Sequence, residues 1–297
     1  MASFVFTGTS TDWSDLLDDL RTHLTDGVTL GSEVWTELAI DTSITDERIV
    51  YLEGPGLAGA DEININIREF KNVGSDIYNW QIRGAVSYNA LNSFATQPGT
   101  SPAVNLPLWD SSIPYWLIVN GRRFILIAKV STTYHTLYAG FTLPYATSAE
   151  MPYPIYVGAS AQSELRWSDG TYKLGAFWDP TTTSAYLRHF DGAWVTIQNY
   201  SNGSSNTRSE VTSNVVWPWE KDYAIGQNDD GNYGLLPAVI HANYSGGNVY
   251  GELDGVYFIS GFSAAAEDIA EIGADDYLVV QAAYRTGRRD YAAIKLG

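Results

Sequence analysis

A run of β-forming residues that turns back on itself constrains the fold more than any other feature of this sequence. The apolar residues Pro114–Val119 are followed by Asn120-Gly121, and a second apolar run then returns. An Asn-Gly pair between two such runs is a strong hairpin signal, because a type I′ turn needs positive φ at both central residues. The continuous apolar run Phe124–Ala128 indicates a strand buried on both faces, and Thr136–Pro144 follows as a third strand. The stretch Ile113–Ser160 therefore predicts the central hairpin of an antiparallel sheet.

The composition favours the same fold class. The chain contains 20 Tyr, 10 Trp and 10 Phe but only 2 Met, together with 27 Gly. Such a composition is typical of short strands joined by tight turns rather than of a helical bundle. We predict a mainly β protein of antiparallel β-sandwich or jelly-roll-like domains. Its length of 297 residues favours two domains, residues 1–159 and 160–297, over one large sandwich.

One amphipathic helix is predicted near the N-terminus. Trp13, Leu16, Leu17, Leu20 and Leu24 recur at the spacing of one helical face. A residue among Ser10–Asp12 is expected to cap the helix, and Gly27 is expected to end it. The aspartates within the helix are interpreted as a solvated face near its positive end rather than as metal ligands.

Further strands are predicted on both sides of the hairpin. Ile63–Arg68 alternates strictly between apolar and polar residues, so we expect one buried and one polar face. Leu91–Leu106 is rich in Gly, Pro, Ser and Thr and is predicted to be a loop. For Phe262–Ile272 the sequence allows either a short helix or a loop followed by a strand.

Charge and cysteine content exclude several classes of function. The net charge of −17 disfavours binding to DNA or RNA. The absence of cysteine excludes disulfides, thiolate metal sites and cysteine nucleophiles. The N-terminus lacks the basic and apolar regions of a signal peptide, and no run reaches the length of about 18 apolar residues needed to span a membrane. We therefore expect a soluble chain made in a cytosol, without membrane insertion.

No catalytic, cofactor or metal site is predicted from motifs. The histidines His23, His135, His189 and His241 show no zinc-ligand spacing and are interpreted as packing or surface residues. Asp229-Asp230-Gly231-Asn232 resembles part of a calcium loop but does not match the EF-hand pattern. A glycosidase needs two carboxylates with no fixed spacing in sequence, so this alternative stays open.

Two groups of residues are candidate contact surfaces. The first is a set of tryptophans that belongs either to the core or to a surface for carbohydrate or protein. Its members are Trp167, Trp178, Trp194, Trp217 and Trp219. The second is a set of arginines in predicted turns, which are either ordinary solvated charges or subunit contacts. These are Arg122, Arg123, Arg285, Arg288 and Arg289.

Several stretches carry a resemblance to a known family. They are Asn120–Thr132, Leu143–Ala146, Tyr153–Ser160, Gly54–Ile63, Tyr78–Trp80, Gly255–Asp268 and Tyr277–Leu296. In these stretches the sequence resembles virion structural proteins of tailed bacteriophages and prophages. The resemblance extends from near the predicted helix to the last residue and is weakest over Ala161–Gly247. These stretches are not chemical motifs, so no catalytic residue is carried over.

The resemblance implies a structural, non-enzymatic role without a cofactor. It implies a location in the virion, in the tail, baseplate or collar region, after synthesis in the host bacterial cytoplasm. The expected partners are further copies in a symmetric homo-oligomer and other virion tail proteins. The arginine turns and the polar tract Asn199–Asn214 are the expected contacts. One alternative is a receptor-binding or lectin-like module that binds host surface glycans, and another is a polysaccharide hydrolase.

Overall fold

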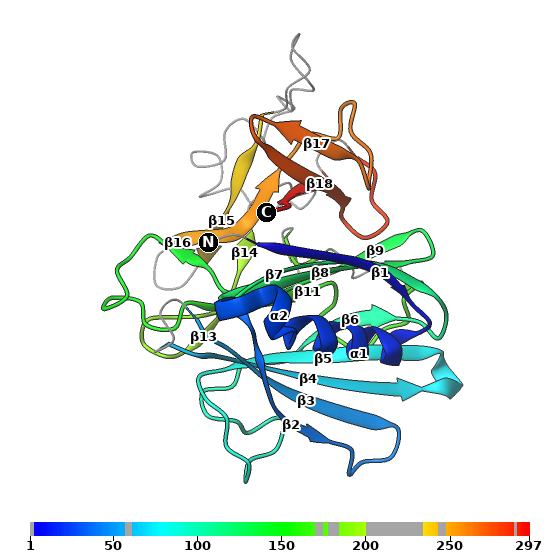
Figure 1. Cartoon of the computed structure of the whole chain (residues 1–297), viewed down its shortest axis with the longest axis vertical. Helices are drawn as coiled ribbons and strands as arrows, with labels where there is room; N and C mark the ends of the chain where they lie inside the picture. Colours follow the sequence, from blue (N-terminus) through cyan, green and yellow to red (C-terminus); the bar gives the residue numbers. More distant parts are fainter. Residues whose placement is uncertain are drawn as a thin grey trace.

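The computed structural model describes residues 3–56, 61–169, 175–177, 184–199, 234–242, 248–287 and 290–297. Within these residues the protein is mainly β, with three antiparallel sheets and two short α-helices. This confirms the predicted fold class. Figure 1 shows the sheets as three layers. We call the middle layer sheet A, the lower layer sheet B and the upper layer sheet C.

Sheet A is the middle layer and contains the predicted hairpin. Its strands, in spatial order, are β1 (Phe4–Ser10), β7 (Ile113–Asn120), β8 (Arg123–Val130), β9 (Thr133–Phe141), β11 (Ile155–Ala159), β12 (Ala185–Arg188) and β13 (Trp194–Thr196). Strands β11 and β12 are neighbours although they lie on either side of the predicted domain boundary at residue 159. The division into two domains remains a prediction.

The outer layers are sheets B and C, and sheet B precedes most of sheet A in the chain whereas sheet C mainly follows it. Sheet B contains β2 (Thr36–Asp41), β3 (Glu47–Gly54), β4 (Ile63–Asn72), β5 (Ile77–Ala85) and β6 (Val104–Leu108). Sheet C contains β14 (Gln198–Asn199), β15 (Leu236–Ala242), β16 (Asn248–Phe258), β19 (Tyr291–Lys295), β18 (Asp275–Gln281) and β17 (Ile269–Ile272), and β10 (Leu143–Pro144) pairs with β16. The segment Phe262–Ile272, for which the sequence allows either a helix or a loop and a strand, is thus a loop followed by the strand β17.

Two hydrophobic cores separate the three layers. On β8, Phe124 and Leu126 pack into the first core between sheets A and B, whereas Ile125 and Ile127 pack into the second core with residues of sheet C. Successive side chains of a strand point to opposite faces, so one strand serves both cores. This confirms that Phe124–Ala128 is buried on both faces.

The hairpin turn differs from the predicted type. Asn120 pairs with Arg123, so Gly121 and Arg122 form the turn, and neither has a positive φ. The prediction of a type I′ turn is therefore wrong. The side chain of Asn120 shapes the turn instead, because its Oδ1 accepts hydrogen bonds from the backbone N–H groups of Arg122 and Arg123 at 2.9 and 3.0 Å.

Gly121 is required by its neighbours rather than by its backbone angles. Its N–H donates to Glu33 Oε2 at 2.6 Å. A Cβ at this position would lie 2.7 Å from that oxygen and 2.8 Å from Pro55 Cγ. Only glycine therefore allows the turn to approach the end of sheet B so closely.

The predicted helix is α1 (Trp13–Leu24), and its buried leucines are those of the apolar face. The Asp12 carboxylate caps it by accepting from the N–H groups of Ser14 and Asp15. Gly27 does not end this helix: α1 stops at Leu24, and Gly27 begins the short helix α2 (Gly27–Leu30). Short 3₁₀ turns span Gly31–Glu33 and Val73–Ser75.

The second face of β4 is polar, as predicted, but its asparagines are buried. Asn64 and Asn66 on this face are only 2% and 1% exposed. Tyr51 lies opposite Asn66 on β3, and it packs with residues of the 86–103 loop in a separate apolar cluster on the outer side of sheet B. The loop thus covers a face that alternation alone predicts to be exposed.

Candidate functional site

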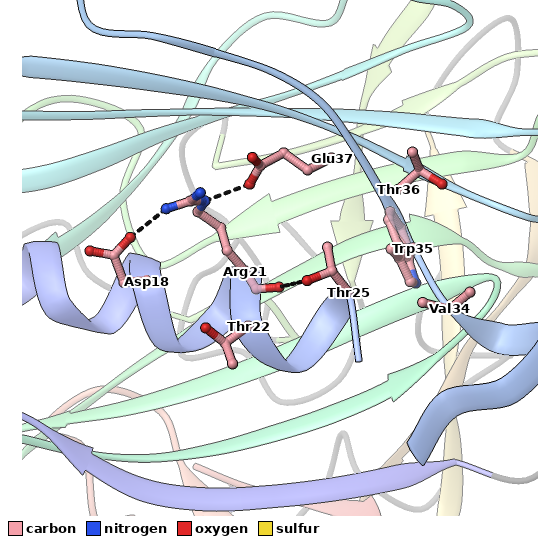
Figure 2. A pocket seen from close by; sticks show the side chains of 8 residues that line it. All are labelled: Asp18, Arg21, Thr22, Thr25, Val34, Trp35, Thr36 and Glu37. Atoms are coloured by element: carbon pink, nitrogen blue, oxygen red, sulfur yellow. Dashed lines mark hydrogen bonds and ion pairs between the residues drawn. The ribbon is translucent and has the colours of Figure 1, made fainter. Parts of the chain in front are cut away.

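An open groove of about 520 Å³ lies between the second half of α1 and the segment that leads into β2. Figure 2 shows its lining, which is mostly polar and includes the charged side chains of Asp18, Arg21 and Glu37. The lining residues are Asp18, Arg21, Thr22, Thr25, Val34, Trp35, Thr36 and Glu37. The buried apolar face of α1 fixes the helix against both sheets, so its polar residues are held at the groove.

Arg21 connects the two sides of the groove. Its Nε donates to Glu37 Oε2 at 2.6 Å, and its Nη1 donates to Asp18 Oδ1 at 2.5 Å (Figure 2). The hydrogen bond to Glu37 raises the pKa of Arg21, and the charges of both carboxylates add to this effect despite partial burial. The guanidinium therefore stays charged and holds the carboxylates in fixed positions.

The ion-pair network continues from the groove into the interior. Arg48 on β3 donates to Asp18 Oδ1 at 2.8 Å and contacts Glu69 Oε1 on β4 at 2.9 Å. Ser14 Oγ donates to the same oxygen of Glu69 at 3.0 Å. Burial raises the pKa of Glu69, although the charge of Arg48 opposes the shift. The helix is thus tied by polar contacts to three successive strands of sheet B.

The chemistry of the groove is that of hydrogen bonding. Its hydroxyl groups belong to Thr22, Thr25 and Thr36, and no histidine is among its lining residues. Its two carboxylates, Asp18 and Glu37, are both ion-paired with Arg21. The lining therefore provides donors and acceptors in fixed positions but no nucleophile with an adjacent base.

The predicted contact residues Arg122 and Arg123 lie at a junction between sheets A and C. The side chain of Arg123 is only 1% exposed, and its Nη1 and Nη2 donate to the carbonyl oxygen of Ile118 and to Ser3 Oγ at 3.1 and 3.0 Å. Both arginines contact Asp254 Oδ2 on β16, at 3.3 Å from Arg122 and 3.5 Å from Arg123. Arg123 is therefore an internal connection, whereas a contact of Arg122 with another subunit remains a prediction.

A second polar junction lies at the other end of β8. Lys129 and Tyr134 both donate to Glu267 Oε1, which belongs to the loop before β17. The backbone N–H of Tyr134 also donates to the carbonyl oxygen of Ala283 at 3.1 Å. Sheet C is therefore attached to both ends of β8, with the second core between the two junctions.

The remaining predicted contact residues are only partly described. Arg285 is half-buried, while Arg288 and Arg289 lie outside the described residues. Trp167 is half-buried against Trp109, with ring centroids 5.1 Å apart, and Trp194 donates from its Nε1 to the carbonyl oxygen of Gly99 at 2.8 Å. Trp178, Trp217, Trp219 and the loop at Asp229-Asp230 lie outside the described residues, as does the polar tract beyond Asn199. Of the predicted contact residues that the structure describes, none lines the groove.

The histidines with described side chains lie within the fold. His23 stacks on Phe6, and its Nε2 lies 2.9 Å from the Tyr115 hydroxyl. His135 is fully buried, and His189 Nδ1 lies 2.9 Å from Asp191 Oδ1. The side chain of His241 is outside the described part. Over the described ranges, no group of three or more His, Asp or Glu side chains is placed to hold a metal ion.

Sequence reasoning missed the residues that form these polar sites. Arg21, Glu37, Asp254 and Glu267 occur in no chemical motif. The contacts of Arg21 with Glu37, of Arg123 with Asp254 and of Lys129 with Glu267 join residues that are distant in sequence. Only the acidic residues of the helix were recognised, and they were interpreted as a solvated face. Among the described residues, no helix has the length and apolar character to cross a bilayer. No protein-family model matches the chain, and no curated protein matches it.

Proposed function

We propose that this chain is a structural component of a tailed bacteriophage particle, in the tail, baseplate or collar region. It acts by protein–protein contacts, as a rigid unit in a symmetric assembly of its own copies and other tail proteins. The resemblance of the hairpin and C-terminal stretches to virion structural proteins supports this proposal. The groove supports it as well, since its lining provides no catalytic group.

The single observation that carries the proposal is the way the three layers are joined. Strand β8 contributes side chains to both cores, and polar junctions at both of its ends tie it to sheet C. These connections resist sliding of the layers, as a subunit under mechanical force in a virion tail requires.

Among the described edge strands, β2 and β17 are candidates for contacts in such an assembly. Within the described ranges, β2 and β17 each pair with one neighbouring strand and form the edges of sheets B and C. Ile40 on β2 is 40% exposed and Ile269 on β17 is 51% exposed. Sheet edges accept an extended strand from another chain through backbone hydrogen bonds.

Light scattering on the purified chain, combined with edge variants, tests the proposal. Ile40→Lys and Ile269→Lys add charge at the two edges without removing a buried group, so both variants are expected to keep the wild-type unfolding midpoint. We expect a ring-sized multiple of 32.7 kDa for the wild type and a smaller species for at least one variant. A monomeric wild type that also fails to enter particles of the phage or prophage encoding it would contradict the proposal.

A further inference from the structure

The groove between α1 and β2 has hydrogen-bonding capacity that the protein does not use. Asp18 contacts Arg21 and Arg48 through Oδ1 alone, and Glu37 contacts Arg21 through Oε2 alone. In the part of the chain that the structure describes, Asp18 Oδ2, Glu37 Oε1 and Arg21 Nη2 form no hydrogen bond with the protein. The groove thus offers two acceptors and one donor group beside the hydroxyl groups of Thr22 and Thr36, whereas the Thr25 hydroxyl already donates to the carbonyl oxygen of Arg21.

The ion pairs of the site carry one excess negative charge. Asp18 and Glu37 pair with Arg21, whereas Arg48 is shared between Asp18 and Glu69. This excess and the net charge of −17 on the whole chain disfavour an anionic ligand. A neutral ligand whose groups both donate and accept hydrogen bonds matches the unused acceptors and donor of the groove. Vicinal hydroxyl groups have this property.

The side chains are already held in position. The side chains of Arg21 and Glu37 are 22% and 26% exposed, and the ion pair between them spans the groove. A ligand therefore meets groups that lose little further conformational freedom on binding. The volume of about 520 Å³ lies within the range of roughly 300–1,000 Å³ that is typical of small-molecule pockets. Because the groove is open, it can hold one unit of a longer chain.

We propose that this groove binds a neutral sugar unit of a glycan, with Asp18, Arg21 and Glu37 contacting its hydroxyl groups. This inference does not depend on the proposed structural role in a virion. It also differs from the glycan-binding alternative based on tryptophans, because Trp167 and Trp194 do not line the groove and the proposed contacts are polar side chains.

The test is calorimetric titration of the full chain with a panel of neutral trisaccharides: chitotriose, maltotriose and mannotriose. Thr22→Tyr places a bulky side chain in the groove from an exposed helical position. Val28→Tyr is the matched control, because Val28 is 98% exposed and is not part of the groove lining. Both variants are expected to unfold at the wild-type midpoint, since neither replaces a buried residue.

We expect at least one trisaccharide to bind the wild type. Its affinity for Thr22→Tyr is expected to be lower by a factor of about ten or more, and its affinity for Val28→Tyr is expected to be unchanged. Failure of every trisaccharide to bind the wild type would overturn the inference. Binding that Thr22→Tyr leaves unchanged would place the ligand elsewhere and would also overturn it. Trilysine is included in the panel, and binding of trilysine without any trisaccharide would show a site for a basic peptide instead.

Discussion

At the scale of single residues, Arg123 shows how a buried charged side chain can connect separate segments of the chain. Its guanidinium reaches a backbone carbonyl, a serine hydroxyl and a carboxylate from three different segments. The planar group with five donors makes this possible, and lysine cannot reproduce it. Because Arg123 is buried and both arginines contact Asp254, we expect Arg122→Glu with Arg123→Glu to be destabilised.

Arg123→Ala is expected to lower the free energy of unfolding by about 3–5 kcal/mol, because it breaks a buried ion pair. Urea denaturation followed by circular dichroism measures this change. Arg166→Ala is the control, since Arg166 is 49% exposed and pairs only with Asp169 three residues away. An exposed pair contributes roughly 0–1 kcal/mol. Equal unfolding midpoints for the two variants would contradict the internal role of Arg123.

Glu267 gives the junction at the other end of β8 a pH dependence. Burial raises the pKa of Glu267, but the hydrogen bonds from Lys129 and Tyr134 and the charge of Lys129 outweigh burial, so the pKa lies below its ordinary value of 4.5. The folded state therefore binds this proton less readily than the unfolded chain. Its contribution to stability is present above pH 4.5 and is lost as the pH falls through the lowered pKa.

The stability difference between wild type and Glu267→Gln should therefore shrink as the pH falls from about 6 to about 3. Urea denaturation of both proteins at each pH measures this difference. The contributions of the other carboxylates to the pH dependence are the same in both proteins and cancel in the comparison. A difference that stays constant over this range would show that the Glu267 carboxylate does not stabilise the junction.

At the scale of elements, α1 combines an apolar face with polar contacts to sheet B. Leu20 is 1% exposed in the first core. Leu20→Ala is expected to cost about 2–5 kcal/mol of unfolding free energy, because it leaves a cavity between the helix and the sheets. Thr22→Ala, on the exposed face of the same helix, is expected to change it by less than about 0.5 kcal/mol. Similar urea midpoints for both variants would contradict the packing described for α1.

The sequence predicts elements with local signals better than elements that depend on distant partners. The helix and the hairpin strands follow from periodicity within a few residues, and both are confirmed. The burial of Asn64 and Asn66 does not follow, because the loop that covers this face begins about 20 residues later in the chain. The hairpin turn was also mispredicted, because the Asn120 side chain and the contact of Gly121 with Glu33 replace the backbone preference of the dipeptide.

The candidate groove was inaccessible to sequence reasoning for the same physical reason. Glu37 meets Arg21 only because the chain reverses after α1 and enters β2 alongside the helix. The junction of Arg123 with Asp254 joins residues more than 100 positions apart. No periodicity or motif encodes such pairs, although the charged residues themselves are visible in the sequence.

At the scale of the whole molecule, the shared middle sheet predicts cooperative unfolding. Since β8 contributes to both cores, loss of either core exposes apolar side chains of sheet A. We expect one transition in urea, with the same midpoint by tryptophan fluorescence and by far-ultraviolet circular dichroism. Slow amide exchange in β4 and β18 should report the same free energy of opening. Two separate transitions would instead support independent domains divided near residue 159.

The presence of the chain in assembled particles tests the central proposal most directly. Quantitative mass spectrometry of particles purified from the phage or prophage that encodes the chain measures its copy number relative to the other tail proteins. The proposed structural role predicts a fixed copy number that matches the rotational symmetry of the tail. A chain that is abundant in the lysate but absent from purified particles would contradict this role.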